Sequence, residues 1–154
     1  FTTYAIVPAY FFYQAGLAPA GWNLPCAAAM LLAAALYYGK EGMVSDDMHF
    51  VGFPVLWNVF VFFLFFIFSF PGWLNAALVG LFSILHFVPI KFAYPSRALR
   101  WRTLTLAVGL AAMAAGGAII WLYPDNPVWL KGVTVAALAC FAGLAGWETF
   151  GYNK

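Results

Sequence analysis

The chain has 154 residues, of which 66% are hydrophobic and only 8% are charged, and its mean hydropathy is +0.90. Soluble domains carry about 25% charged residues, so this composition excludes a globular domain with an ordinary polar surface. The net charge of +2 gives no indication of nucleic-acid binding. The apolar runs are continuous and do not alternate, so they predict an all-α fold, a polytopic integral membrane helical bundle.

Six apolar runs predict six transmembrane helices within a single membrane domain that covers residues 1–154. A helix needs about 20 apolar residues to cross a bilayer. The dipeptide Pro71-Gly72 and the turn Pro124–Pro127 interrupt the apolar sequence between neighbouring runs. The predicted helices cover residues 1–17, 23–38, 54–70, 74–92, 103–123 and 128–150.

Basic residues lie in alternate connections between the predicted helices. Lys40 follows the second helix, and the connection between the fourth and the fifth carries Lys91, Arg97, Arg100 and Arg102. The positive-inside rule places these two connections in the cytoplasm. The opposite ends carry four tryptophans, as an interfacial aromatic belt would: Trp22, Trp73, Trp121 and Trp129.

The predicted cytoplasmic ends hold most of the side chains that chemistry could use. Asp46 and Asp47 could bind a divalent cation through oxygen ligands. Adjacent side chains point in different directions, however, and this favours solvated loop charge for the pair. Lys91 and Arg97 could bind phosphate, for which the planar guanidinium is well suited. The alternative role for these cations is to set the topology and to contact anionic lipids.

Two polar side chains, His86 and Asn58, lie within predicted helices, where each needs a partner. Ionisable residues at such depth are candidates for function, and a neutral histidine bonded across helices is the alternative for His86. Aromatic residues make up 21% of the chain. Some rings near the predicted cytoplasmic end could surround a quaternary ammonium group, although aromatic residues also favour membrane interfaces. These rings belong to Tyr37, Tyr38, Phe53, Trp57 and Tyr94.

Two segments of the chain resemble the CDP-alcohol phosphotransferase family. The segment SDDMHFVGFPVLWN matches a family motif through Asp47, His49, Gly52, Phe53, Pro54, Trp57 and Asn58. The segment HFVPIKFAYPSR matches a second motif through Val88, Pro89, Ile90, Lys91, Tyr94, Pro95, Ser96 and Arg97. The likeness covers most of residues 1–102 and continues more loosely to the end. It implies an enzyme of the bacterial inner membrane with its active site at the cytoplasmic face.

Both motifs are most similar to those of family members that use choline as the acceptor alcohol. The resemblance implies that the whole protein transfers a phosphatidyl group from CDP-diacylglycerol to choline and releases CMP. It implies that Lys91 and Arg97 hold the lipid phosphates, that Trp57 and Asn58 contribute to a choline pocket, and that Asp47 also binds substrate. The alternatives are a member of the family that acts on serine and a non-catalytic membrane transporter or structural protein. The resemblance also allows a homodimer.

The family's catalytic motif has no counterpart in this sequence. In the family, Asp-Gly-x-x-Ala-Arg followed by Gly-x-x-x-Asp-x-x-x-Asp binds two divalent metal ions, Mn²⁺ or Mg²⁺, and supplies the base. The last Asp of that motif ordinarily comes directly before a segment like Phe1-Thr2-Thr3-Tyr4, so the resemblance places the motif upstream of Phe1. We therefore expect neither a catalytic residue nor a metal ligand in this chain. We interpret it as the C-terminal six of about eight helices, inactive without the segment that precedes it.

Overall fold

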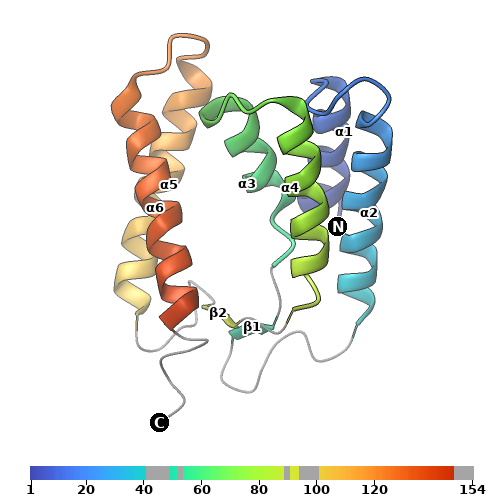
Figure 1. Ribbon diagram of the computed structural model, residues 1–154. Coiled ribbons are helices and arrows are strands. Elements are labelled where there is room, and N and C mark those ends of the chain that lie inside the picture. Colours follow the sequence, from blue (N-terminus) through green and yellow to red (C-terminus); the bar gives the residue numbers. More distant parts are fainter. Residues whose placement is uncertain (41–48, 52–53, 89–90, 94–100, 148–154) are drawn as a thin grey trace. The chain divides into compact units, whose positions relative to one another are not determined.

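The computed structural model describes residues 1–40, 49–51, 54–88, 91–93 and 101–147 (Figure 1). Turns and irregular segments connect helices in these residues, and the only other regular elements described are two strands of three residues each, so the predicted all-α class is confirmed. The chain forms two compact units, one of residues 1–43 and 51–89, the other of residues 44–50 and 90–154. The single membrane domain expected from the sequence stays a prediction.

The first unit is a bundle of four helices. Its helices are α1 (Val7–Gln14), α2 (Asn23–Gly39), α3 (Trp57–Phe62) and α4 (Gly72–Leu85). A π-helical segment, Thr2–Ile6, precedes α1, and a second, Phe63–Ile67, continues α3. Helix α1 packs against α2 and α3, and α2 packs against α4. Phe60 of α3 and Phe82 of α4, whose ring centroids lie 5.1 Å apart, connect α3 with α4.

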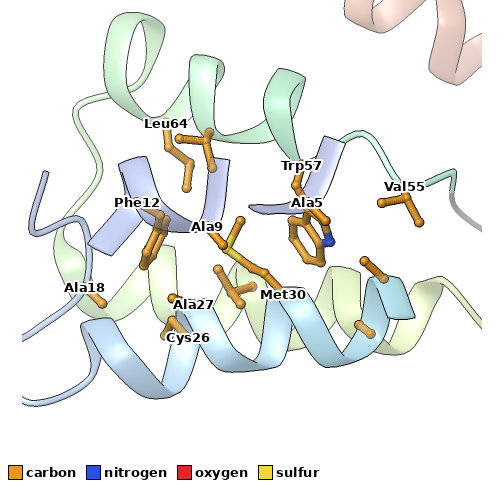
Figure 2. Close-up of a cluster of buried hydrophobic side chains, with 14 of the residues drawn as sticks. Ala5, Ala9, Phe12, Ala18, Cys26, Ala27, Met30, Val55, Trp57 and Leu64 are labelled. Carbon is orange, nitrogen blue, oxygen red and sulfur yellow. The ribbon is translucent and has the colours of Figure 1, made fainter. Parts of the chain in front are cut away.

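The core of this bundle is built from side chains at helical spacing, with many alanines among them. Ala5, Ala9 and Phe12 follow one another at intervals of four and three residues, which places them on one face of α1 and of the π-helical segment before it. Trp57, Val61 and Leu64 repeat this spacing on α3 and its π-helical continuation. Helix α2 contributes Cys26, Ala27, Met30, Ala33, Ala34 and Tyr37. Figure 2 shows the large side chains of Phe12, Met30 and Trp57 among these alanines.

The outward faces of the helices carry large apolar side chains. On α2, Leu24, Leu32 and Leu36 are 65%, 64% and 64% exposed. Soluble monomers rarely expose contiguous apolar faces, which mark contact with lipid or with another protein. Trp22 and Trp73, expected at the same end of the molecule, line one hollow of about 430 Å³ between α2 and α4. The exposed apolar faces therefore fit the membrane environment expected from the composition.

The second unit contains two long helices and most of a small sheet. Helices α5 (Arg102–Trp121) and α6 (Val128–Gly146) pack against each other. Strand β1 (His49–Val51) pairs with strand β2 (Lys91–Ala93), and β2 packs against α6. Among the helices that the structure describes, α5 alone is long and apolar enough to cross a membrane by itself. The other apolar helices offer shorter apolar stretches of 10–17 residues, and in α6 this stretch is Val128–Leu144.

The prediction of one helix over residues 74–92 is wrong. Helix α4 ends at Leu85, and Lys91–Ala93 forms strand β2 instead. Pro89 explains why the helix cannot continue to residue 92. A proline lacks the backbone N–H and disfavours helical geometry in the residue before it. The helices expected over 1–17 and 54–70 are also shorter than predicted, covering Thr2–Gln14 and Trp57–Ile67 with π-helical portions.

Candidate functional site

Three helix ends meet in the first unit around a cluster of aromatic rings. Tyr37 lies in the last turn of α2, Trp57 begins α3, and His86 follows the last residue of α4. The ring centroids of Trp57 and His86 lie 5.1 Å apart, and those of Tyr37 and His86 lie 5.5 Å apart. Phe60 adds an edge contact to Trp57 at 5.4 Å. The imidazole of His86 therefore lies beside rings from two neighbouring helices.

This ring cluster is buried and contains polar atoms. Trp57 and His86 are fully buried and Tyr37 is nearly so. Within the described part of the chain, the Tyr37 hydroxyl and the Trp57 indole N–H have no hydrogen-bond partner. A buried polar group without a partner costs about 1–3 kcal/mol. The packing of the rings therefore has to offset this cost.

Asn58, the residue after Trp57, faces a different part of the unit. Successive residues of an α-helix point about 100° apart, since a turn contains 3.6 residues. Asn58 lines a hollow of about 170 Å³ between α1 and α3, together with Phe11, Phe62 and Phe66. Its side-chain oxygen Oδ1 is buried and accepts no hydrogen bond from any residue that the structure describes. Trp57 thus packs in the core while Asn58 lines the hollow.

The sequence-predicted substrate residues fall into three groups. Trp57 and Asn58 lie in the first unit with the surroundings given above. Lys91 is the first residue of strand β2 in the second unit. Asp47, Phe53, Tyr94 and Arg97 lie outside the described residues. The binding roles expected for all of these residues stay predictions.

Phe1 is the residue upstream of which the family resemblance places the catalytic motif. Its backbone carbonyl oxygen accepts a hydrogen bond from the N–H of Ala5 at 2.9 Å, so the helical hydrogen bonding begins at Phe1 itself. Its phenyl ring lies edge-on to that of Tyr38 near the end of α2, with the centroids 6.1 Å apart. This side chain has a packing contact and no group that could transfer a proton or bind a metal. The position of the catalytic motif upstream of Phe1 stays a prediction.

The two segments that carry the family resemblance contact each other. Trp57, near the end of the first segment, packs against His86, the first residue of the second segment. Strand β1 of the first segment also pairs with strand β2 of the second. The sequence placed Tyr37 and Trp57 in one set of rings near the predicted cytoplasmic end, but it did not predict that His86 packs against both of them.

Three phenylalanines that line the hollow, Phe11, Phe62 and Phe66, were not predicted as site residues from the sequence. Asn58, Phe62 and Phe66 follow at intervals of four residues, and this spacing places them on one helix face. This spacing could have indicated a shared face, but the same run contains several other phenylalanines, so the pattern does not stand out. Phe11 comes from a separate helix, and its place in the hollow required the tertiary structure.

Metal ligands do not gather in the described ranges of the chain. Within them, no group of three or more His, Cys, Asp or Glu side chains comes close enough to hold a metal ion. The residues that the structure describes therefore do not fit the divalent metal that the family resemblance implies.

Comparison with known proteins gives one consistent class of relatives, enzymes of phospholipid synthesis. They are phosphatidylcholine synthases. The protein of Mesorhizobium japonicum is 40% identical over 161 residues, covering 94% of this chain and 59% of the relative. The protein of Rhizobium meliloti is 37% identical over 131 residues (84% and 54%), and that of Brucella melitensis is 35% identical over 140 residues (90% and 50%).

The chain spans between 50% and 59% of the length of these relatives. No family model matches it, and no solved structure matches it. The relatives confirm the resemblance drawn from the two motif segments. The chain is homologous to phosphatidylcholine synthases over most of its length.

Proposed function

We propose that the whole protein containing this chain is a phosphatidylcholine synthase. The identity of 35–40% to proteins of that name, over 84–94% of the chain, carries this proposal. In the proposed reaction the choline hydroxyl attacks the β-phosphate of CDP-diacylglycerol. A bond forms between the choline oxygen and that phosphorus, the bond to CMP breaks, and the hydroxyl proton passes to a base.

Cations at the predicted cytoplasmic end have a natural role in this reaction. Phosphoryl transfer depends on positioning and on neutralising the charge of the phosphate oxygens. Lys91 and Arg97 belong to the second matched segment, and we assign them to the lipid phosphates. Asp47, from the first segment, is assigned to substrate binding with them. A divalent metal, Mn²⁺ or Mg²⁺, would add positive charge, with ligands outside the residues described for this chain.

We further propose that the protein is a multi-pass protein of the bacterial inner membrane, with its active site at the cytoplasmic face. The length of α5, the exposed leucines of α2 and the placement of the basic residues support this location. The tryptophans at the opposite helix ends support it as well, since Trp121 and Trp129 are strongly exposed. A homodimer is the assembly that the family resemblance allows.

Choline incorporation by the whole protein tests the proposed function. The complete gene, expressed in a bacterium without phosphatidylcholine, should convert labelled choline and CDP-diacylglycerol to phosphatidylcholine with release of CMP. Labelled serine in the same membranes is the matched control, and its incorporation in place of choline would favour the serine-specific alternative. Incorporation of neither alcohol would favour a non-catalytic membrane protein. Residues 1–154 alone should give no product.

A further inference from the structure

The hollow between α1 and α3 has the composition of a binding site for a small organic cation. Asn58, Phe62 and Phe66 form one wall, while Phe11, Val7 and Pro8 contribute to the other. The residues that line this hollow are uncharged. Both walls adjoin π-helical segments, since Phe66 belongs to Phe63–Ile67 and Val7 follows Thr2–Ile6. Such segments are rare and frequently occur at functional sites.

Aromatic rings and one acceptor atom supply the recognition chemistry of this hollow. The rings of Phe62 and Phe66 lie with centroids 5.1 Å apart and an angle of 35° between their planes. The faces of phenyl rings attract a quaternary ammonium group, which has no N–H to donate and needs no hydrogen-bond acceptor. The buried Oδ1 of Asn58 accepts no hydrogen bond from the residues described, so it remains available to a hydroxyl donor.

We propose that this hollow is the choline subsite of the enzyme, an inference that rests on the proposed function. The trimethylammonium group contacts Phe11, Phe62 and Phe66, and the choline hydroxyl donates to Oδ1 of Asn58. Asn58 comes before Phe62 and Phe66 along the chain. The choline hydroxyl therefore faces the N-terminal end of α3. This is the end of α3 that belongs to the first matched segment, and the ammonium group lies toward the π-helical segment.

The same lining disfavours other acceptor alcohols. Serine carries a carboxylate, and burial of an ion without a partner is costly. The residues of the lining offer it no cation. Ethanolamine carries a primary ammonium group with three N–H donors, and the amide of Asn58 supplies one side-chain acceptor for them. Choline alone among these three combines a cation that needs no hydrogen bonds with a single hydroxyl.

Steady-state kinetics of the full-length enzyme in membranes test the subsite. Phe62→Leu should raise the KM for choline on the order of 3- to 30-fold, because one cation–π contact is lost. Asn58→Leu should raise it roughly 2- to 12-fold through loss of the hydrogen bond. The KM for CDP-diacylglycerol should not change in either variant. Phe70→Leu is the matched control, because Phe70 stacks on Phe68 and is not part of the hollow's lining.

Fluorination separates the cation–π contact from simple packing. Progressively fluorinated phenylalanine at position 62 keeps the ring in place but weakens the negative potential of its face, so the KM for choline should rise stepwise with the number of fluorine atoms. The neutral carbon analogue of choline, 3,3-dimethylbutanol, should compete more weakly than choline with the wild-type enzyme. This difference should shrink as fluorination increases.

The possible results are distinguishable. A wild-type enzyme that incorporates choline, with an unchanged KM for choline in Phe62→Leu and Asn58→Leu, overturns the subsite and leaves the proposed function intact. The subsite is also overturned if the KM for choline rises by the same amount in every fluorinated variant as in Phe62→Leu. It is likewise overturned if the KM values for choline and for CDP-diacylglycerol rise equally. A wild-type protein that incorporates no choline removes the proposed function itself.

Discussion

The indole of Trp57 lies against the imidazole of His86, with their ring centroids 5.1 Å apart and both side chains fully buried. Trp57 begins α3 and His86 follows α4, so this contact joins the start and the end of one helical hairpin. It also joins the two segments on which the family resemblance rests. Tyr37 extends the contact to α2 through its own packing on His86.

Removal of the Trp57 ring should strongly destabilise the first unit. Trp57→Ala leaves a large cavity in the core and deletes the contacts with His86 and Phe60, so the free energy of unfolding should fall by about 3–5 kcal/mol. Thermal or denaturant unfolding of the detergent-solubilised protein measures the change. Trp121→Ala is the control, because Trp121 is 88% exposed. Equal losses in the two variants would contradict the burial of Trp57.

Gly72 lies where the start of α4 approaches the chain that follows α1. A Cβ atom at this position would come within 3.0 Å of two backbone atoms, the carbonyl carbon of Ala18 and the nitrogen of Pro19. Gly72→Ala should therefore cost about 1–3 kcal/mol through overpacking. Gly80→Ala on the same helix has open space around the added atom and should instead stabilise α4 by about 0.5–1 kcal/mol. Unfolding measurements should show opposite signs, and a shared sign would refute this account.

Asn75 connects α4 to the chain after α1 by a side-chain hydrogen bond. Its side-chain Nδ2 donates to the backbone carbonyl oxygen of Leu17 at 2.8 Å, and the residue is only 3% exposed. Asn75→Ala should cost about 1–3 kcal/mol, because the carbonyl loses its donor. Gln14→Ala removes the exposed hydrogen bond to Tyr10 and should change the stability by less than about 0.5 kcal/mol. Similar losses in both variants would show that the Asn75 bond is dispensable.

The helical class could be predicted from the sequence because long continuous apolar runs leave few other structures in a membrane. The faces of the helices that turn toward the core could not be predicted in the same way. Nearly every position of α2 is apolar, so the hydrophobic pattern alone does not show that Met30 is buried and Leu32 is exposed. The structure separates them by contact: Met30 is fully buried and Leu32 is exposed. The end of α4 was misjudged because apolar residues continue past Leu85, whereas Pro89 is the stronger signal.

The candidate site was predicted only in part. Trp57 and Asn58 were selected through their motif, and the resemblance assigned both to one choline pocket. The helix turns their side chains toward different surroundings. The contact of His86 with Trp57 depends on how the α3–α4 hairpin closes. No local pattern encodes that closure, so the ring cluster could be found only in the folded unit.

Leu32 tests whether the exposed face of α2 contacts lipid. Leu32→Asp places a charge in the middle of this helix, and in a membrane this should cost about 2.5–3.5 kcal/mol of insertion free energy. The fraction of protein recovered in alkali-washed membranes should fall. Leu32→Met, an apolar change at the same exposed position, should leave that fraction unchanged. If Leu32→Asp integrates as well as the wild type, the face of α2 does not contact the hydrocarbon core.

Arg97 lies outside the described residues, and its expected role in phosphate binding is tested by kinetics of the full-length enzyme. Hydrogen bonds to charged groups are worth about 1.5–3 kcal/mol, so Arg97→Ala should raise the KM for CDP-diacylglycerol roughly 10- to 160-fold. Arg97→Lys should recover part of this loss, because lysine keeps the charge but not the planar pair of donors. Arg100→Ala is the matched control from the same connection, outside the matched segment. If the Arg97 and Arg100 variants raise this KM equally, the basic residues act through general attraction to anionic lipid, and Arg97 holds no phosphate of its own.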